Sequence, residues 1–339
     1  MKKAFLVILV LLSASAVFAQ VDFTTFQSGF SEFAQDLANG APLNASTGLS
    51  WSQAYIGQFP HFGLGVTVGA TTLSASAMKK MADALGVTLP SEFSYATKYG
   101  LPLPAYTIDA RIGGFVLPFD IGLKLGYIPP GTLQKMGLSV SADYILAGLD
   151  VRCALLKDEG FIPALSVGLG YNHMQTSVEV PGLLSGAITI AQIDDGSGPH
   201  DLVLSNPSLQ MQWSTNVLDL KVQVSKKLIF ITPYLGAAVS YSFGAQASGT
   251  VQSSVTYNGH ALTQTDIDNI NLYYQLQGQT PPDLSSVGIS ASASSGAGFD
   301  FRAFGGLSFD LFIVYLDLGG AYDISTGAFG GSVNLRIAL

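Results

Sequence analysis

Apolar side chains recur at every second position in ten separate stretches between residue 61 and the C-terminus. In the first stretch, Phe62, Leu64, Val66 and Val68 alternate with glycine and threonine. Successive side chains of a β-strand point to opposite faces, so each stretch predicts a strand with one apolar face and one small or polar face. The expected strands cover about 61–74, 104–117, 119–128, 138–156, 161–178, 207–224, 228–243, 287–309, 311–323 and 329–339. The fold class is therefore all-β, with about ten strands and up to about fourteen if the loops hold further hairpins.

Short and long connections alternate between these strands. The short ones fall at 118–120, 157–160, 225–227 and 308–310, and the long ones run at about 75–103, 179–206 and 244–286. Outer-membrane barrels have this asymmetry, because their periplasmic turns are tight and their extracellular loops are long. The connections predict a transmembrane antiparallel β-barrel over residues 61–339, with its short turns in the periplasm.

An acid and a base stand two residues apart on four of the expected strands. The pairs are Asp109 and Arg111, Asp150 and Arg152, Asp219 and Lys221, and Asp300 and Arg302. Residues two apart point to the same face of a strand, so the members of each pair are expected to bridge each other there. A charge on the opposite, lipid-facing side would cost about 2 to 4 kcal/mol at the bilayer midplane. We therefore expect these pairs, with Lys124, Asp317 and Arg336, to form a belt of charge in the lumen.

Two interpretations of this belt remain open. In the first it fills a narrow lumen and holds the strands in register, and in the second it lines a polar constriction or gate on a path through the barrel. Each of the four pairs contributes one charge of each sign, so the belt predicts no strong preference for anions or cations.

The first 19 residues are expected to be a cleavable signal peptide. Lys2 and Lys3 precede an apolar stretch at 4–12, and Val17-Phe18-Ala19 precedes Gln20 as at a cleavage site. Export together with a barrel pattern predicts the outer membrane of a Gram-negative-type envelope. Outer-membrane lipid and the outer-membrane assembly machinery are then the expected partners.

Residues 20–60 differ from everything that follows them. Phe23, Phe26, Phe30 and Phe33 follow helical spacing, and Asn39-Gly40 is a typical helix end. In one interpretation this amphipathic helix packs against the periplasmic rim of the barrel. In the other, the helix and the 41–60 stretch enter the lumen as a hatch, and the four phenylalanines help to form a site for a hydrophobic ligand.

Composition agrees with a membrane barrel and excludes several other classes. Charged residues make up 11% of the chain, mean hydropathy is +0.39, and the formal net charge is −8. An acidic chain of this kind is not expected to bind nucleic acid. The lone Cys153 is expected to be one more apolar side chain. The stretches 179–206 and 244–286 contain no Lys or Arg, so they predict an acidic outer surface, with a helix at about 265–277.

Catalytic and metal-binding patterns are weak. The four histidines are scattered, and only His173, near the outer end of its strand, is placed as an outer-membrane hydrolase would need. The acids at 194–195 and at 266 and 268 lack calcium-loop spacing. We expect no enzymatic activity, no metal site and no cofactor.

The helical N-terminal segment and the run from Asp120 through Lys124-Leu125-Gly126-Tyr127-Ile128-Pro129-Pro130 carry a family resemblance. With them the chain resembles outer-membrane barrels of the type of the long-chain fatty-acid transporter FadL. The resemblance implies passive uptake of a small hydrophobic molecule, a hatch in the lumen, and a lateral or periplasmic exit. At the place of that family's Asn-Pro-Ala hatch motif, this chain has Asn39-Gly40-Ala41-Pro42.

Three other functions remain open on the sequence. A narrow general porin would need an open aqueous path. A non-transport surface protein, such as an adhesin, would act through its acidic outer loops. A soluble secreted β-protein would need no membrane at all.

Overall fold

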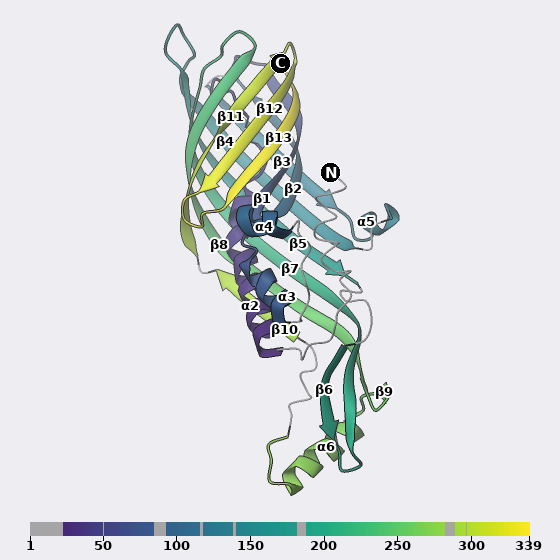
Figure 1. Ribbon diagram of the computed structural model, residues 1–339. Coiled ribbons are helices and arrows are strands. Elements are labelled where there is room, and N and C mark those ends of the chain that lie inside the picture. Colours follow the sequence, from purple (N-terminus) through teal and green to yellow (C-terminus); the bar gives the residue numbers. More distant parts are fainter. Residues whose placement is uncertain are drawn as a thin grey trace.

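Ten antiparallel strands close into a barrel. The structure is a computed structural model that describes residues 23–49, 51–84, 93–115, 118–137, 140–181, 188–281, 289–295 and 297–339. The ring runs in chain order through β1, β2, β3, β4, β5, β7, β8, β11, β12 and β13, and β13 pairs with β1 to close it (Figure 1). The strands are β1 (His61–Leu73), β2 (Leu101–Gly113), β3 (Phe119–Ile128), β4 (Ser141–Leu156), β5 (Ala164–Val180), β7 (Pro199–Ser225), β8 (Ile231–Tyr257), β11 (Gly298–Leu311), β12 (Val314–Asp323) and β13 (Phe329–Ala338). The predicted all-β barrel is confirmed, and each of the ten expected stretches contributes one of its strands. The expected signal peptide lies outside the described residues.

The connections at one end of the barrel are much shorter than at the other, and we call the two the short-turn end and the long-loop end. The turn from β11 to β12 differs from the expectation. It lies at Phe312 and Ile313, because residues 308–310 continue the ladder by pairing with residues 315–317.

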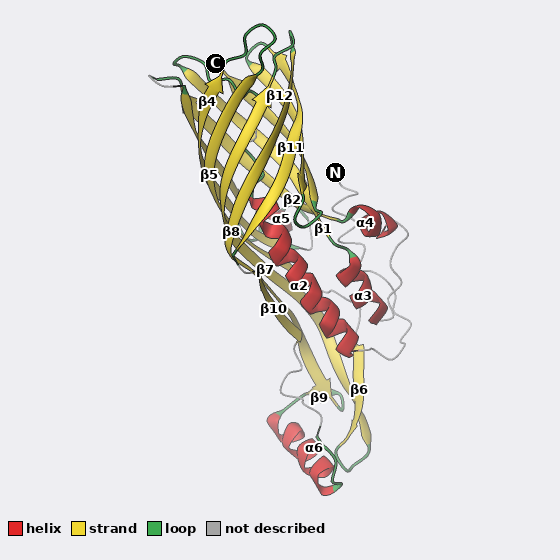
Figure 2. Ribbon diagram, turned by 90° about the vertical axis from the view of Figure 1, so that its left-hand side faces the viewer, coloured by secondary structure: helices red, strands yellow, loops and turns green. Residues whose placement is uncertain are grey.

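Two strands run far beyond the barrel at the long-loop end. β7 and β8 are each 27 residues long, and their outer halves join β6 (Ile188–Asp194), β9 (His260–Ala261) and β10 (Ile289–Ser295) in a projecting sheet that we call the extension (Figures 1 and 2). The stretch expected as one strand at 287–309 is therefore two strands, β10 and β11, which pair with the outer and inner halves of β8. The break lies opposite Gly244, whose φ of +65° is a left-handed conformation that suits glycine.

The barrel wall is apolar outside and polar inside. Outward residues such as Leu64, Leu123 and Leu169 are more than half exposed, whereas the inward residues Asp109 and Asp150 are buried. This arrangement is the reverse of a water-soluble barrel, and it matches a wall surrounded by lipid.

The N-terminal helix α2 (Phe23–Ala45) lies at the long-loop end, and not at the short-turn rim as one interpretation expected. It runs along the inner face of the extension, and its C-terminal end enters the barrel (Figure 2). The expectation that it ends at Asn39-Gly40 is wrong by a turn and a half. Gly40 is needed for close packing instead, since a Cβ there would lie 2.3 Å from Leu73 Cδ2.

The remaining helices are short and lie at or beyond the long-loop end. They are α3 (Ser76–Ala84), α4 (Phe93–Tyr99), α5 (Thr132–Lys135) and α6 (Gln264–Leu276). The last of these is the helix expected at 265–277. Within the described ranges, none of the helices is both long and apolar enough to cross a membrane.

Candidate functional site: a charged lumen and its plug

Paired charges link several strands across the lumen. Arg111 on β2 lies between two carboxylates, 2.7 Å from Asp120 Oδ1 on β3 and 2.5 Å from Asp150 Oδ1 on β4. Arg152 donates to the other oxygen of Asp120 at 2.6 Å, and Lys221 on β7 pairs with Asp150. Each buried charge therefore has a partner, which is the condition for keeping ions in such a space.

The members of the four same-strand pairs do not bridge each other as expected. Some partners lie on the adjacent strand, and Arg336 reaches Asp317 on β12 at 2.8 Å in this way. Others lie two strands away in the ring, because a long side chain can cross over the strand between: Arg302 on β11 crosses β8 and lies 3.1 Å from Asp219 on β7.

Two of the expected belt acids have other surroundings. Asp109 accepts hydrogen bonds from neutral donors, among them Thr107 Oγ1 at 2.6 Å and Asn334 Nδ2 at 2.9 Å. Asp300 is half-buried near the long-loop end, opposite Ser240.

Residues 46–49 and 51–57, which follow α2, pass through the lumen to the short-turn rim, and we call them the plug. Its backbone carbonyls accept hydrogen bonds from the wall. Arg111 Nη2 donates to Leu49 O at 2.9 Å, Gln223 Nε2 to Trp51 O at 2.8 Å, and Arg152 Nη1 to Gln53 O at 2.5 Å. The plug ends at the rim, where Phe59 N donates to Gly114 O at 2.7 Å.

Lys124 holds the outer end of the plug. It was expected in the lumen belt, and its Nζ donates to Ala45 O at 2.8 Å and to Thr47 O at 2.5 Å. The belt cations therefore have two sets of partners, the wall carboxylates and the plug carbonyls. The belt and the plug form one connected structure.

Trp51 is the largest side chain of the plug, and it is only 2% exposed. Its ring lies between two guanidinium groups, 4.7 Å from Arg336 and 5.5 Å from Arg111, and its Nε1 donates to Asp109 Oδ2 at 3.4 Å. The wall accommodates the ring at Gly63, where a Cβ would lie 2.4 Å from Trp51 Cη2. Trp51 therefore fits a shaped recess, in which cation–π contacts add to packing.

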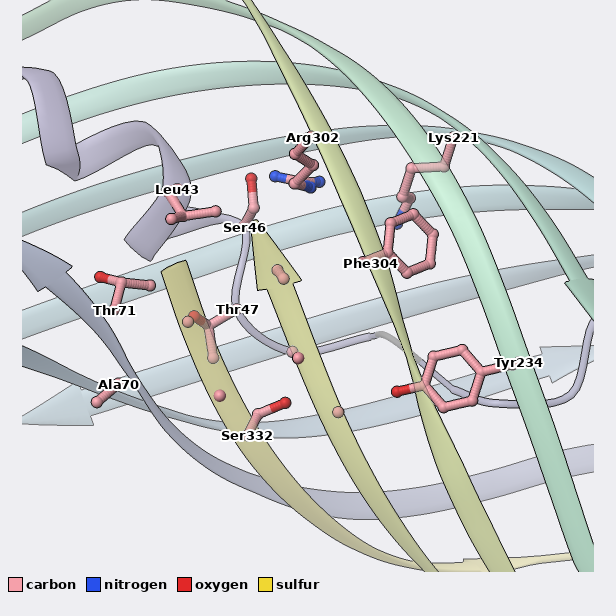
Figure 3. Close-up of a pocket in the computed structure, with 16 residues that line it drawn as sticks. Leu43, Ser46, Thr47, Ala70, Thr71, Lys221, Tyr234, Arg302, Phe304 and Ser332 are labelled. Atoms are coloured by element: carbon pink, nitrogen blue, oxygen red, sulfur yellow. The ribbon is translucent and has the colours of Figure 1, made fainter. Parts of the chain in front are cut away.

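A cavity of about 50 Å³ remains beside the plug. Leu43, Ser46 and Thr47 face it from the N-terminal segment, and Tyr234, Phe304, Arg302 and Lys221 face it from the wall (Figure 3). Its floor includes four glycines, Gly319, Gly320, Gly330 and Gly331. Among the described residues, no recorded hydrogen bond joins the plug to β11 or β12, so this side of the lumen is the less tightly held.

The expected hatch phenylalanines lie further out. Phe30 and Phe33 are buried in an apolar core with Met211, Trp213 and Ala247 of the extension. Their role in binding a ligand stays a prediction. Phe23 and Phe26 belong to the same helix, but their side chains lie outside the described part of the structure.

The other candidates from the sequence are explained by local structure. His173 shares a hydrogen bond with Asn216 at 2.9 Å on the outer face of the wall. Asp194 accepts hydrogen bonds from the backbone N–H groups of Gly196 and Gly198, and Ser197 lowers the pKa of Asp195 by hydrogen bonding to it. In the described ranges, no group of three acid, histidine or cysteine side chains could hold a metal ion.

One interpretation of the sequence placed the 41–60 stretch in the lumen, and the plug lies within that stretch. The contacts that hold the plug were missed, because most of them use its backbone atoms. Trp51 was not singled out from the sequence.

A closed antiparallel barrel with an apolar outer face and a charged, plugged lumen is an outer-membrane β-barrel. No protein-family model matches the chain, and no curated protein does. Similar solved structures include the outer-membrane protease OmpT of Escherichia coli, with 9% identity, 82% of this chain and 95% of that chain covered, and a TM-score of 0.35. The transport unit of the autotransporter AIDA-I of Escherichia coli has 11% identity, coverage of 95% and 100%, and a TM-score of 0.31.

Hydrocarbon transporters are also among the similar structures, as the resemblance to the FadL type implies. The toluene transporter TbuX of Ralstonia pickettii has 11% identity, coverage of 95% of this chain and 98% of that chain, and a TM-score of 0.25.

Proposed function

We propose that this outer-membrane barrel lets a small, largely hydrophobic molecule cross passively when the plug moves. In this proposal the chain reaches the outer membrane through the signal peptide at 1–19. The observation that carries the proposal is the plug itself, which occupies the lumen yet leaves a cavity along β11 and β12.

The attachment of the plug favours displacement over permanent closure. Arg111, Arg152 and Gln223 hold backbone carbonyls, and such hydrogen bonds can be exchanged for water one at a time, each at a net cost of only about 0.5 to 1.5 kcal/mol, or more when the donor is charged. Glycines on the opposite wall provide room for the plug to shift. Phe304 and Tyr234 offer the apolar contact that a hydrophobic solute needs, while a hydrated ion would gain little from them.

A disulfide that locks the plug to the wall tests this proposal. Ala54 N donates to Ser225 Oγ at 2.8 Å, so cysteines at these two positions can be oxidised to a cross-link in a Cys153→Ala background. In proteoliposomes, uptake of the apolar dye N-phenyl-1-naphthylamine should fall to that of protein-free vesicles after oxidation and should recover on reduction. A matched cross-link between Val167 and Val222, which pair within the wall, should leave uptake unchanged.

Two outcomes would contradict the proposal. Uptake that persists with the plug fully cross-linked would show that plug movement is not required. Stable ion conductance of the unlocked protein in planar bilayers would favour the narrow general porin instead.

The extension supports a second candidate, a surface protein that acts through its outer loops. It projects beyond the barrel and carries α6 at its far end (Figure 2). Deleting 258–281 should then abolish binding to a host or surface partner without changing dye uptake, whereas unchanged binding would exclude this role for α6.

A further inference from the structure

Three turns at the short-turn end carry fully exposed bulky apolar residues. Phe161 is 102% exposed, Ile229 89% and Phe312 98%. Each belongs to a two-residue turn, and we call the five apolar residues at these turn tips the crown: Phe161, Ile229, Phe230, Phe312 and Ile313. Turn tips in water are normally polar or glycine, so this surface requires a partner.

The backbone at two of these tips makes the choice of residue more unusual. The first turn has Gly160 at its left-handed position, with φ +56°, as a tight hairpin requires. The equivalent positions of the other two turns are Ile229, with φ +52°, and Phe312, with φ +62°. A β-branched or bulky residue in this conformation is a genuine outlier, so both turns accept backbone strain to keep a large apolar side chain at the tip.

The crown is continuous with the lipid-facing wall and lies at the right height to mark the membrane boundary. Tyr171 and Tyr322 face outward near the other edge of the apolar band, each ten residues along its strand from Phe161 and Phe312. Ten residues rise about 33 Å along a strand, or about 25 Å along the barrel axis at a tilt of about 40°, which equals the usual height of the lipid-facing band. The second boundary therefore falls at the turns themselves.

Several polar groups beneath the crown have partners within the protein. Lys226 Nζ pairs with Asp158 and donates to Gly160 O at 2.6 Å, and Lys227 Nζ lies 3.0 Å from Asp310 Oδ2. Leu228 and Ile231 exchange two backbone hydrogen bonds across their turn. These groups keep their partners on leaving water, as insertion into a lipid interface demands.

We propose that the crown is a membrane anchor whose side chains insert into the inner leaflet of the outer membrane. The short-turn rim then lies in the lipid interface and does not project into the periplasm, and the plug meets the rim at the level of the lipid headgroups. This surface does not depend on the transport proposed above.

Spin labels on single cysteines test the insertion directly. In the Cys153→Ala background, Phe312→Cys and Ile229→Cys would carry a nitroxide in phospholipid vesicles, with Leu272→Cys on α6 as an exposed apolar control in the extension. The crown labels should be relaxed more by oxygen than by a water-soluble nickel chelate, and the control should show the reverse. Crown labels as open to nickel as the control would place the tips in water and overturn the proposal, leaving a soluble periplasmic protein as the partner to seek.

A second test asks whether glycine substitutions at the turn tips raise or lower the stability of the protein. The double change Ile229→Gly and Phe312→Gly places glycine at the left-handed position, as in the turn that contains Gly160, and so removes the backbone strain. If the tips were in water, the urea midpoint of the protein in vesicles would rise. We expect it to fall, because lost insertion of two large side chains outweighs the relief of strain, and a rise would overturn the proposal.

Discussion

The inner and outer halves of β7 face different solvents, although they belong to one uninterrupted strand. Within the barrel, Leu218, Leu220, Val222 and Val224 point outward and Asp219 points inward. In the extension, the outward residues are Asn216, Ser214 and Gln212, and the inward ones are Trp213 and Met211. The polarity of both faces inverts where the strand leaves the membrane band.

Strand β8 makes the same change with a shift of one residue. Its outward positions are odd-numbered up to Tyr241 and Phe243 and even-numbered from Gln246 and Ser248, because the bulge at Gly244 adds a residue. A strand thus keeps its backbone pairing across the boundary while its side chains follow the surrounding medium. The barrel has an apolar outer face and a polar inner face, whereas the extension has a polar outer face and an apolar inner face. Four changes test this contrast.

The largest effect is expected in the lumen. Arg111→Leu would remove one of the two cations that Asp120 contacts and one of the two that Asp150 contacts, and loss of one member of a buried ion network costs about 3 to 5 kcal/mol. Urea unfolding in lipid vesicles measures the change. The exposed Lys135→Leu on α5 is the control and should shift stability by less than about 0.5 kcal/mol. A small loss of stability in the Arg111→Leu variant would mean that the lumen carboxylates are well hydrated.

A matched pair of arginines on the outward face of β7 comes next. Val222→Arg, nearer the middle of the lipid-facing band, should cost about 2 to 4 kcal/mol, because the charge would face hydrocarbon. Gln212→Arg, ten residues further out on the same face, should change stability by less than about 0.5 kcal/mol. The same vesicle assay compares the two. Equal costs would show that the boundary does not lie between them.

A smaller effect is expected where α2 packs on the extension. A Cβ at Gly249 would lie 2.5 Å from Phe30 Cζ, so Gly249→Ala should overpack this core and cost about 1 to 3 kcal/mol. Since the core is local, the loss should appear as faster proteolysis of α2 with an intact barrel. Ser248→Ala, on the outward face, is the control. Unchanged proteolysis would show that α2 adjusts freely.

The smallest effect concerns the helix at the far end of the extension. Thr263 caps α6 and Asp266 completes the capping box, so Thr263→Ala should weaken this helix by about 1 kcal/mol. The hydrogen bond from Thr263 lowers the pKa of Asp266 below its ordinary value of 3.8. The contribution of the ionised carboxylate is therefore fully present above pH 3.8 and is lost as the pH falls through the lowered pKa. Hydrogen exchange of α6 should rise in that range while the barrel stays protected, and an unchanged rate would exclude the cap as its cause.

The barrel was predictable because lipid imposes a simple rule on every strand. Alternation gave the strands to within a few residues, and the charge of Arg111 alone required an inward position. The outer halves of β7 and β8 were missed for two reasons. The alternation of apolar and polar side chains reverses its faces at Asn216, and it shifts by one residue at Gly244. The apolar-outward pattern therefore ends at these points, although both strands continue.

The ion partners and the contacts of the plug could not be predicted for different reasons. Which carboxylate meets Arg111 depends on the stagger of neighbouring strands, and the i and i+2 spacing does not determine it. The plug is held at carbonyls, as at Leu49 and Gln53, and a backbone contact leaves no residue-type pattern. One interpretation of the sequence placed the 41–60 stretch in the lumen, and its path there runs inward from the long-loop end.

Because of that path, the N-terminal segment of the chain passes through the closed ring of strands. The seam that closes the ring joins β1 and β13, the first and last strands, while α2 lies on one side of the ring and β1 begins at the other. A wall that sealed first would have to admit the 23 residues of α2 through a lumen already crowded by the Arg111 network. We therefore expect the N-terminal segment to be in place before the seam between β1 and β13 closes.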